Sequence, residues 1–207
     1  MLRAALISEL GRFGDEAVIA ECQRRFGAFL LNPASLAPNL RTPVIQTVGR
    51  YADQASFDKL RALGQAASGT EEKLRYYYAL ARAQEPQFID QNIAIALAGG
   101  ISNGRFSRFL LEMALQSNDP DGVWKAVLGE RAPILEKLPI GRRGDFLPVI
   151  AQASANPAIA RELIALPEEQ TSEGARYQAA KAAENIQEKF AFKNKLLPPL
   201  AQWLRVN

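Results

Sequence analysis

The sequence predicts an all-α domain made of successive antiparallel helix pairs. Three observations lead to this prediction. Apolar residues recur at helical spacing in segment after segment, and the breaks between these segments carry residues that begin or end helices. No run alternates strictly between polar and β-branched apolar residues, as a half-buried strand would. With 207 residues, 48% of them hydrophobic, the chain is long enough to bury a substantial core.

The helical spacing is clearest in six segments. In the first, Val18, Cys22, Phe26 and Phe29 share one face with Leu30. The same spacing recurs in residues 74–81, 106–113, 124–128, 159–166 and 196–204. Cys22, Trp124 and Trp203 lie on these stripes, so we expect all three to be packing residues.

The breaks carry Gly, Pro, Asn, Asp and Thr. They are Gly11 to Gly14 with Asp15 as a cap, residues 32–39, Thr42–Pro43 as a cap with Pro at the first helical position, residues 68–70, 99–100 and 118–120, a turn between Gly141 and Gly144, Asn156–Pro157, and Thr171. They divide the chain into roughly ten to twelve helices joined by short loops. This favours a HEAT- or armadillo-like superhelix over residues 1–207, with a compact α bundle as the alternative.

The composition excludes several classes of chemistry. The chain has no histidine, which removes the usual ligand of catalytic zinc and the usual general base. A single cysteine excludes an internal disulfide and a CxxC site. The 25 basic and 22 acidic residues give a net charge of +3 without a basic tail, so we expect no nucleic-acid partner. No apolar stretch is long enough for a membrane span.

Arg75 and Tyr76 are candidate ligand-contacting residues. Tyr77 and Tyr78 fit the apolar stripe and are expected in the core, whereas Tyr76 points elsewhere and is expected to be exposed. Arg75 could pair with a substrate carboxylate in a bidentate manner. The alternative for Arg75 is an ordinary helical ion pair with Glu71 or Glu72.

Arg142 and Arg143 are the other two candidates for ligand contact, because a glycine-flanked turn with two guanidinium groups can bind an anion. The alternative is a solvated turn. Arg105 and Arg108 are interpreted as a solvated helix face. The pair Glu168–Glu169 lies in a predicted loop that lacks the apolar surroundings needed to raise a carboxyl pKa. We therefore predict no catalytic residue and no metal ligand in this chain.

Several short motifs follow one another along the chain, in residues 10–15, 25–26, 32–41, 48–53, 57–60, 70–81, 121–127 and 190–204. In this order they resemble the C-terminal domain of M1-family (puromycin-sensitive aminopeptidase-like) zinc aminopeptidases. Each motif alone is short, but together they run along nearly the whole chain. Gly122 and Val123 depart from the pattern, since larger residues are expected before Trp124.

The resemblance implies a superhelix of helix pairs that carries no catalytic residue. In that family a separate thermolysin-like domain holds the HExxH zinc site, so zinc is expected there and no cofactor here. The resemblance implies that this domain closes the peptide cavity and limits substrate size. Its expected partners are the catalytic domain of the same polypeptide and the peptide substrate, with no membrane. The candidate peptide-contacting residues are then Arg75, Tyr76, Arg142 and Arg143. The abrupt start leads us to expect an excised domain of a longer enzyme.

Two other functions stay open at this point. A free-standing helical scaffold would bind a partner protein along its concave face, but its first helix, with Leu2, Leu6 and Leu10, is more apolar than a capping helix should be. A helical glycosylase would need a basic stripe, which the balanced charge does not supply. Cytoplasmic and periplasmic locations are both compatible with the sequence.

Overall fold

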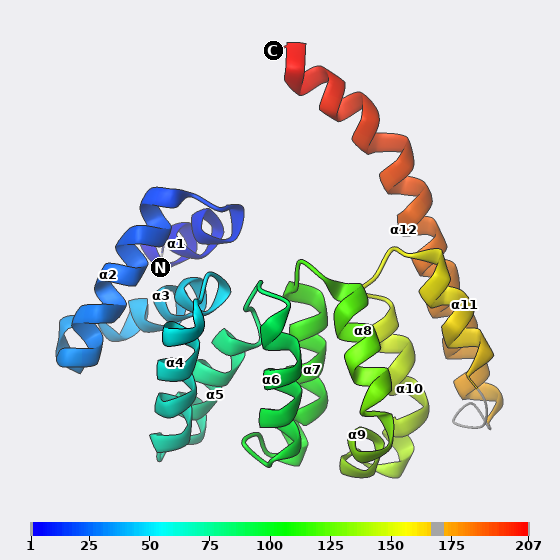
Figure 1. The fold of residues 1–207 in the computed structure, drawn as a ribbon, viewed down its shortest axis with the longest axis horizontal. Helices are drawn as coiled ribbons and strands as arrows, with labels where there is room; N and C mark the ends of the chain where they lie inside the picture. The colour runs from blue at the N-terminus through cyan, green and yellow to red at the C-terminus, as the bar shows by residue number, and fades with distance from the viewer. Residues whose placement is uncertain (1, 167–171, 207) are drawn as a thin grey trace. The chain divides into compact units, whose positions relative to one another are not determined.

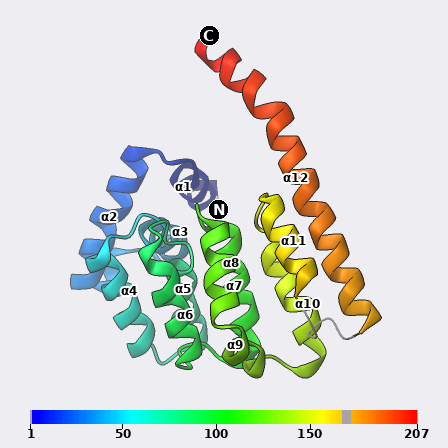
Figure 2. The ribbon, with the colours of Figure 1, turned by 45° about the vertical axis from the view of Figure 1, so that its right-hand side comes forward.

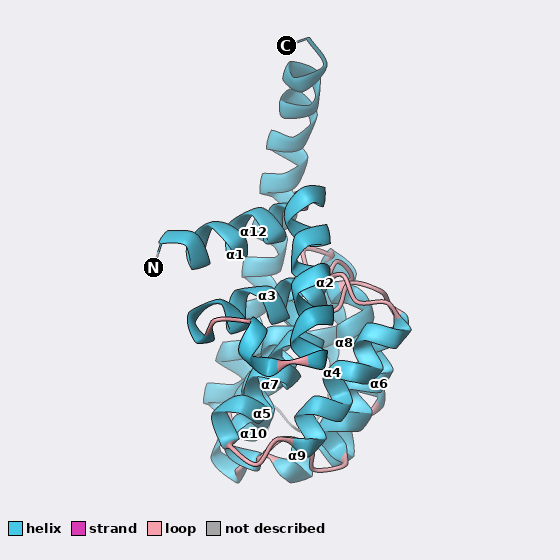
Figure 3. Ribbon diagram, turned by 90° about the vertical axis from the view of Figure 1, so that its left-hand side faces the viewer, coloured by secondary structure: helices cyan, strands magenta, loops and turns pink. Residues whose placement is uncertain are grey.

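The computed structural model describes residues 2–166 and 172–206, and every regular element in these ranges is a helix (Figure 3). The all-α prediction is confirmed. The described residues form twelve α-helices and one short 3-10 helix, which agrees with the predicted number of helices. Glu168, Glu169 and the predicted cap Thr171 lie outside the described residues.

The chain divides into two compact units, Met1–Asp119 and Pro120–Asn207 (Figure 1). The first unit contains α1 (Leu2–Phe13), α2 (Glu16–Leu31), η1 (Pro33–Ser35), α3 (Pro38–Arg50), α4 (Gln54–Ala66), α5 (Thr70–Leu80), α6 (Gln87–Leu97) and α7 (Asn103–Gln116). Within it, α3 packs against α1, α2 and α5, and α5 packs against α4 and α7 as well. The helix α5 is therefore covered on several sides.

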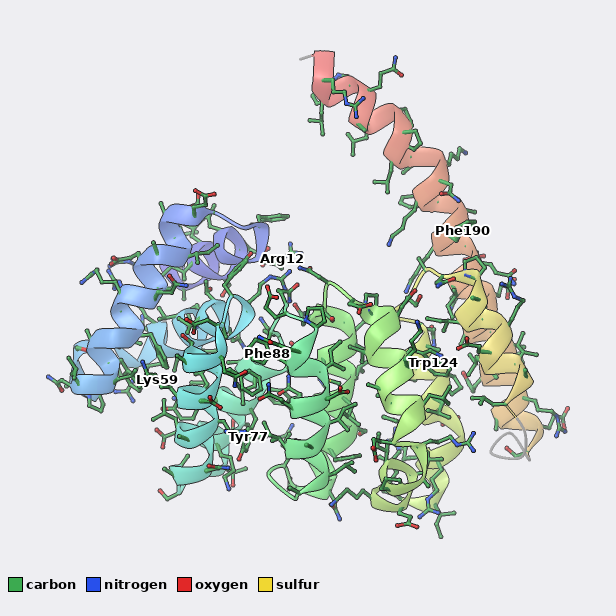
Figure 4. All side chains as sticks on the ribbon, in the orientation of Figure 1. Arg12, Lys59, Tyr77, Phe88, Trp124 and Phe190 are labelled. Atoms are coloured by element: carbon green, nitrogen blue, oxygen red, sulfur yellow. The ribbon has the colours of Figure 1, made fainter. Side chains whose placement is uncertain are left out.

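Aromatic and aliphatic side chains fill the interior of the first unit. Phe57 on α4 and Phe88 on α6 stack with their ring centroids 4.3 Å apart, and both are fully buried. Phe88 is labelled in Figure 4. Phe106, Phe109 and Leu110 on α7 are also fully buried. Since burying one such side chain contributes about 1.5–3 kcal/mol, these residues account for much of the stability of the unit.

The second unit contains α8 (Pro120–Gly129), α9 (Arg131–Lys137), α10 (Ile140–Ala151), α11 (Pro157–Ala165) and α12 (Glu173–Val206). Trp124 is fully buried, and its indole Nε1 donates a hydrogen bond to Glu162 Oε2 at 2.9 Å. The long helix α12 packs on α10 and α11 and then continues beyond them (Figure 2). No described helix is both long and apolar enough to cross a bilayer.

Helix capping follows the sequence at several predicted positions. The carboxylate of Asp15 accepts a hydrogen bond from Val18 N, and the side chain of Asn156 accepts one from Ala158 N. Gly14 adopts a φ of +86°, which favours glycine, at the turn between α1 and α2. The prediction for Thr42–Pro43 is wrong: α3 already begins at Pro38, and Pro43 lies inside the helix. Two prolines compete for the first turn here, and Pro38 occupies it.

The expectation for the tyrosine run is also wrong in part. Tyr76 is 2% exposed, and its hydroxyl lies 3.4 Å from Glu72 Oε1, whereas Tyr78 is only half-buried. A single apolar stripe predicts burial for one face only. Because α5 is packed by α3, α4 and α7, it buries Tyr76 in addition to Tyr77.

Cys22 and Trp124 are core residues as predicted, but Trp203 is 59% exposed. The other apolar residues of the same closing segment, Leu196, Leu200 and Leu204, are exposed too. The helical spacing of this segment was interpreted correctly, because it lies within α12. What the spacing does not reveal is that the apolar stripe of this segment is exposed.

Candidate functional site

A hollow of about 490 Å³ opens on the first unit and is lined mainly by charged and polar side chains. We call it the arginine hollow. Its residues are Gln46, Tyr78, Arg82, Arg105, Arg108 and Glu112. They come from α3, from α5 and the turn after it, and from α7. A smaller hollow of about 20 Å³, with room for about one water molecule, adjoins it and shares Gln46 and Arg82.

Helical spacing places the residues of the hollow on two facing surfaces. Arg105, Arg108 and Glu112 are three, four and seven residues apart on α7, so they share one face. Tyr78 and Arg82 are four residues apart at the end of α5. The fully buried Phe106, Phe109 and Leu110 fix the other side of α7 in the core. The polar face of the helix must therefore point outward to the hollow.

Glu112 and Arg82 form the fixed part of the hollow. Arg82 donates two hydrogen bonds to Glu112 Oε1, from Nε at 3.0 Å and from Nη2 at 2.7 Å. The side chain of Glu112 is only 10% exposed. A buried carboxylate requires such a partner, because an unpaired buried charge is strongly destabilising. Arg82 is thus neutralised by Glu112 and held in one orientation.

Arg105 and Arg108 are the cations available to a ligand. Arg108 Nη2 lies 3.8 Å from Glu112 Oε2, a longer contact than the Arg82 pair, and its side chain is 62% exposed. Arg105 is exposed and forms no salt bridge with any described residue. One carboxylate faces three guanidinium groups in the hollow, so the site keeps a net positive charge.

Two buried polar atoms at and beside the hollow lack partners in the described part of the chain. They are the hydroxyl oxygen of Tyr78 and the Nε of Arg50. Burial raises the pKa of Tyr78, while Arg105 and Arg108 act in the opposite direction. The phenol therefore stays protonated at neutral pH and can donate a hydrogen bond. Unsatisfied buried donors are uncommon, and here they border a cationic surface.

Arg50 belongs to a junction where three helices end. Arg50 Nη1 and Gln84 Nε2 both donate to the carbonyl oxygen of Gln116, at 3.3 and 2.7 Å. Gln84 N in turn donates to Arg50 O at 3.1 Å. These bonds satisfy carbonyl groups at the ends of α3 and α7, which helices leave without partners. The junction supports the wall that the smaller hollow shares with Arg82 and Gln46.

The four predicted contact residues do not line this hollow. Arg75 is half-buried on α5 and forms no salt bridge with Glu71, Glu72 or any other described residue. Arg142 and Arg143 lie in the first turn of α10, in the second unit, so the predicted Gly141–Gly144 turn is wrong. Contact of Arg75, Tyr76, Arg142 or Arg143 with a peptide stays a prediction.

Arg143 also stabilises the end of the preceding helix, α9. Its Nε donates to Leu138 O at 3.2 Å and its Nη2 donates to Glu136 O at 3.4 Å, so it caps the end of α9. Arg41 does the same at the start of α3, donating to Leu36 O and Pro33 O at 3.2 and 3.1 Å. Both arginines stand at the fourth position of their helix. The pair Arg142–Arg143 therefore forms a helix start that reaches back to the preceding segment.

Sequence reasoning missed most of the hollow. Arg105 and Arg108 were interpreted as a solvated face, and Gln46, Tyr78, Arg82 and Glu112 were not identified as site residues. The available signal was the spacing of Arg105, Arg108 and Glu112 on one helix face. Arg82 and Glu112 are 30 residues apart, and no local pattern shows that they meet.

The most strongly shifted carboxyl group lies elsewhere. On α2, hydrogen bonds from Arg24 and Arg25 lower the pKa of Glu21 to about 2. This cluster sits on the surface and is a helical ion network. The described residues contain no group of three or more Asp, Glu, His or Cys that could hold a metal ion. The residues present do not fit zinc, and we assign no metal-dependent step to this chain.

The model of the ERAP1-like C-terminal domain matches residues 1–188 of the chain. The chain belongs to the ERAP1-like C-terminal domain family. It is similar to aminopeptidase 2 of Candida albicans (strain SC5314 / ATCC MYA-2876), with 25% identity over 97 residues.

That alignment covers 46% of this chain and 10% of the relative, so the chain matches about a tenth of the length of the yeast protein. The family match and this relative together support an aminopeptidase-type C-terminal domain, as the motif resemblance predicted. All residues that line the arginine hollow lie within the part of the chain that matches the ERAP1-like C-terminal domain.

Proposed function

We propose that this ERAP1-like C-terminal domain is a non-catalytic part of a zinc aminopeptidase, where it bounds the peptide cavity and limits the size of the substrate. In this proposal, zinc and the residues that cleave the peptide belong to the catalytic domain of the enzyme. The domain contributes a surface that contacts the peptide away from the bond that is cleaved. Membership of the ERAP1-like C-terminal domain family supports the proposal that this domain is part of an aminopeptidase.

The observation that carries the peptide contact is the arginine hollow. Arg105 and Arg108 are exposed cations beside a buried, unpaired phenol hydroxyl on Tyr78. Guanidinium groups bind carboxylates through paired, charge-assisted hydrogen bonds, and a phenol donor adds a third. Peptides carry a carboxylate at their C-terminus. We therefore assign the hollow to the carboxylate end of the peptide, far from the amino end that an aminopeptidase cleaves.

The test uses the aminopeptidase polypeptide that contains this domain, with the double variant Arg105→Ala/Arg108→Ala. The substrates are one peptide with a free C-terminal carboxylate and the same peptide with an amidated C-terminus. Losing a charge-assisted hydrogen bond costs about 1.5–3 kcal/mol, so kcat/KM for the free acid should fall roughly ten- to a hundredfold. The value for the amide should change by less than about twofold.

Arg61→Ala is the matched control, because Arg61 is a half-buried arginine on α4 that does not line the hollow. It should leave both substrates unaffected. An equal loss for the free acid and the amide would contradict the carboxylate assignment. So would an unchanged kcat/KM for the free acid in the double variant.

A further inference from the structure

The helix α12 carries one apolar seam along its whole length, but only its first half is covered. In the first half, the seam residues Ala175, Ala179, Ala182, Ala183 and Ile186 are buried against the neighbouring helices α10 and α11. In the second half, Phe190, Leu196, Leu197, Leu200, Trp203 and Leu204 are between 42% and 63% exposed. Figures 1 and 2 both show this half of α12 standing clear of α10 and α11.

The two halves of the seam follow the same register. Residues 175, 182, 189, 196 and 203 are spaced by sevens, as are 179, 186, 193 and 200, and also 183, 190, 197 and 204. Such spacing keeps one face of a helix turned toward a packing partner. Phe190, labelled in Figure 4, stands where burial stops. The exposed half is thus continuous with an interface that already packs helix against helix.

The junction between the halves is polar and anchored. Lys189 and Lys193 occupy seam positions there, and the Lys189 ammonium donates to the carbonyl oxygen of Gln152 at the end of α10. Burial and the neighbouring Lys193 lower the pKa of Lys189. The anchor holds the start of the exposed segment to the second unit. The apolar residues that follow it on α12 are exposed.

Two prolines inside the exposed segment strengthen the case for a partner. Pro198 and Pro199 lie within α12 and lack the N–H groups that would bond to the carbonyls four residues earlier. A helix interrupted in this way is weak in water unless tertiary packing supports it. Exposed leucines and a tryptophan on the same segment supply the apolar face for such packing.

The charge of residues 189–207 indicates the kind of surface that this segment can bind. From residue 189 to the end the basic residues are Lys189, Lys193, Lys195 and Arg205, and there is no acidic residue. Two copies of such a helix would repel each other, which disfavours pairing with a second copy of this chain. A groove with an apolar floor and acidic side chains at its rim would match both the seam and the charge.

We propose that residues 190–204 of α12 dock into an acidic-rimmed apolar groove on the catalytic domain of the aminopeptidase. This inference rests on the proposed function. The heptad-like register favours a helical protein surface over a lipid surface, because it continues a seam that already contacts helices.

The test is hydrogen exchange of residues 194–206 in the aminopeptidase polypeptide, comparing Leu200→Glu and Trp203→Glu with the unmodified protein. Docked helix amides should be protected, and each variant should speed their exchange by at least about tenfold. Leu31→Glu is the matched control, since Leu31 is 90% exposed on α2 and lies off the seam. Fluorescence of the buried Trp124 in the Trp203→Glu variant, with its spectrum compared before and after unfolding, checks that the second unit stays folded.

Three results would overturn docking on the catalytic domain. The first is unprotected exchange in the unmodified polypeptide. The second is a dimer by light scattering that Leu200→Glu dissociates. The third is binding to vesicles of equal parts phosphatidylcholine and phosphatidylglycerol that Trp203→Glu abolishes. The free-acid preference that depends on Arg105 and Arg108 is measured separately, so failure of docking leaves the proposed function standing, and the reverse also holds.

Discussion

At the scale of single residues, one glycine decides how closely two helices of the first unit approach. Gly49 on α3 faces α5, and a Cβ atom at this position would lie 2.2 Å from the carbonyl oxygen of Ala79. The obstacle is backbone, which cannot rotate away as a side chain would. Gly27 in the middle of α2 has nothing within 4 Å of the equivalent position. The two glycines therefore have opposite consequences for stability.

We predict that Gly49→Ala destabilises the protein by about 1–3 kcal/mol, because overpacking forces α3 and α5 apart. Gly27→Ala should stabilise it by up to about 1 kcal/mol, since alanine is the better helix former at an open position. Urea unfolding followed by circular dichroism measures both. If Gly49→Ala unfolds at the same urea concentration as the unmodified protein, the close approach of α3 to Ala79 is wrong.

At the scale of elements, the starts of the helices are fixed by short polar side chains. Asp53 precedes α4, and its carboxylate accepts a hydrogen bond from Ser56 N at 2.8 Å. This bond satisfies one of the free N–H groups of the first helical turn. The same bond lowers the pKa of Asp53 below its ordinary value of 3.8. Capping at this position thus depends on pH.

We predict that Asp53→Ala costs about 0.5–2 kcal/mol at neutral pH. Because the pKa of Asp53 is lower in the folded state, the carboxylate stabilises the fold above about pH 4, and this stabilisation is lost as the pH falls through the folded pKa. The difference between the unmodified protein and Asp53→Ala should therefore shrink in acid. Asp53→Asn is the control, because its amide oxygen caps without titrating in this range, so its difference from Asp53→Ala should persist.

At the scale of the whole molecule, the functional groups that the described residues supply together matter more than any single site. The described residues bring together arginines and buried donors but no group able to bind a metal. In the proposed enzyme, zinc belongs to the catalytic domain. The domain described here contributes two surfaces, the arginine hollow in the first unit and the uncovered half of α12 in the second.

We predict that a chelator leaves the thermal unfolding of this chain unchanged, because no described residues form a metal site. The same treatment should abolish peptide cleavage by the aminopeptidase polypeptide, and added zinc should restore it. Circular dichroism and release of the N-terminal amino acid measure the two effects. A fall in the melting temperature of the chain with chelator would place a structural metal in it and contradict this division.

The sequence alone determined the helical class, the breaks near residues 14, 32–37, 68–69, 99–102 and 117–119, and the caps at Asp15 and Asn156, because spacing and capping act over a few neighbouring residues. It also determined the absence of histidine chemistry. Only the tertiary structure decided that Tyr76 is buried, that Arg82 meets Glu112, and that the stripe of Trp203 is uncovered. Each of these depends on which helices lie against a given face, and contacts between residues far apart in the chain leave no local pattern in the sequence.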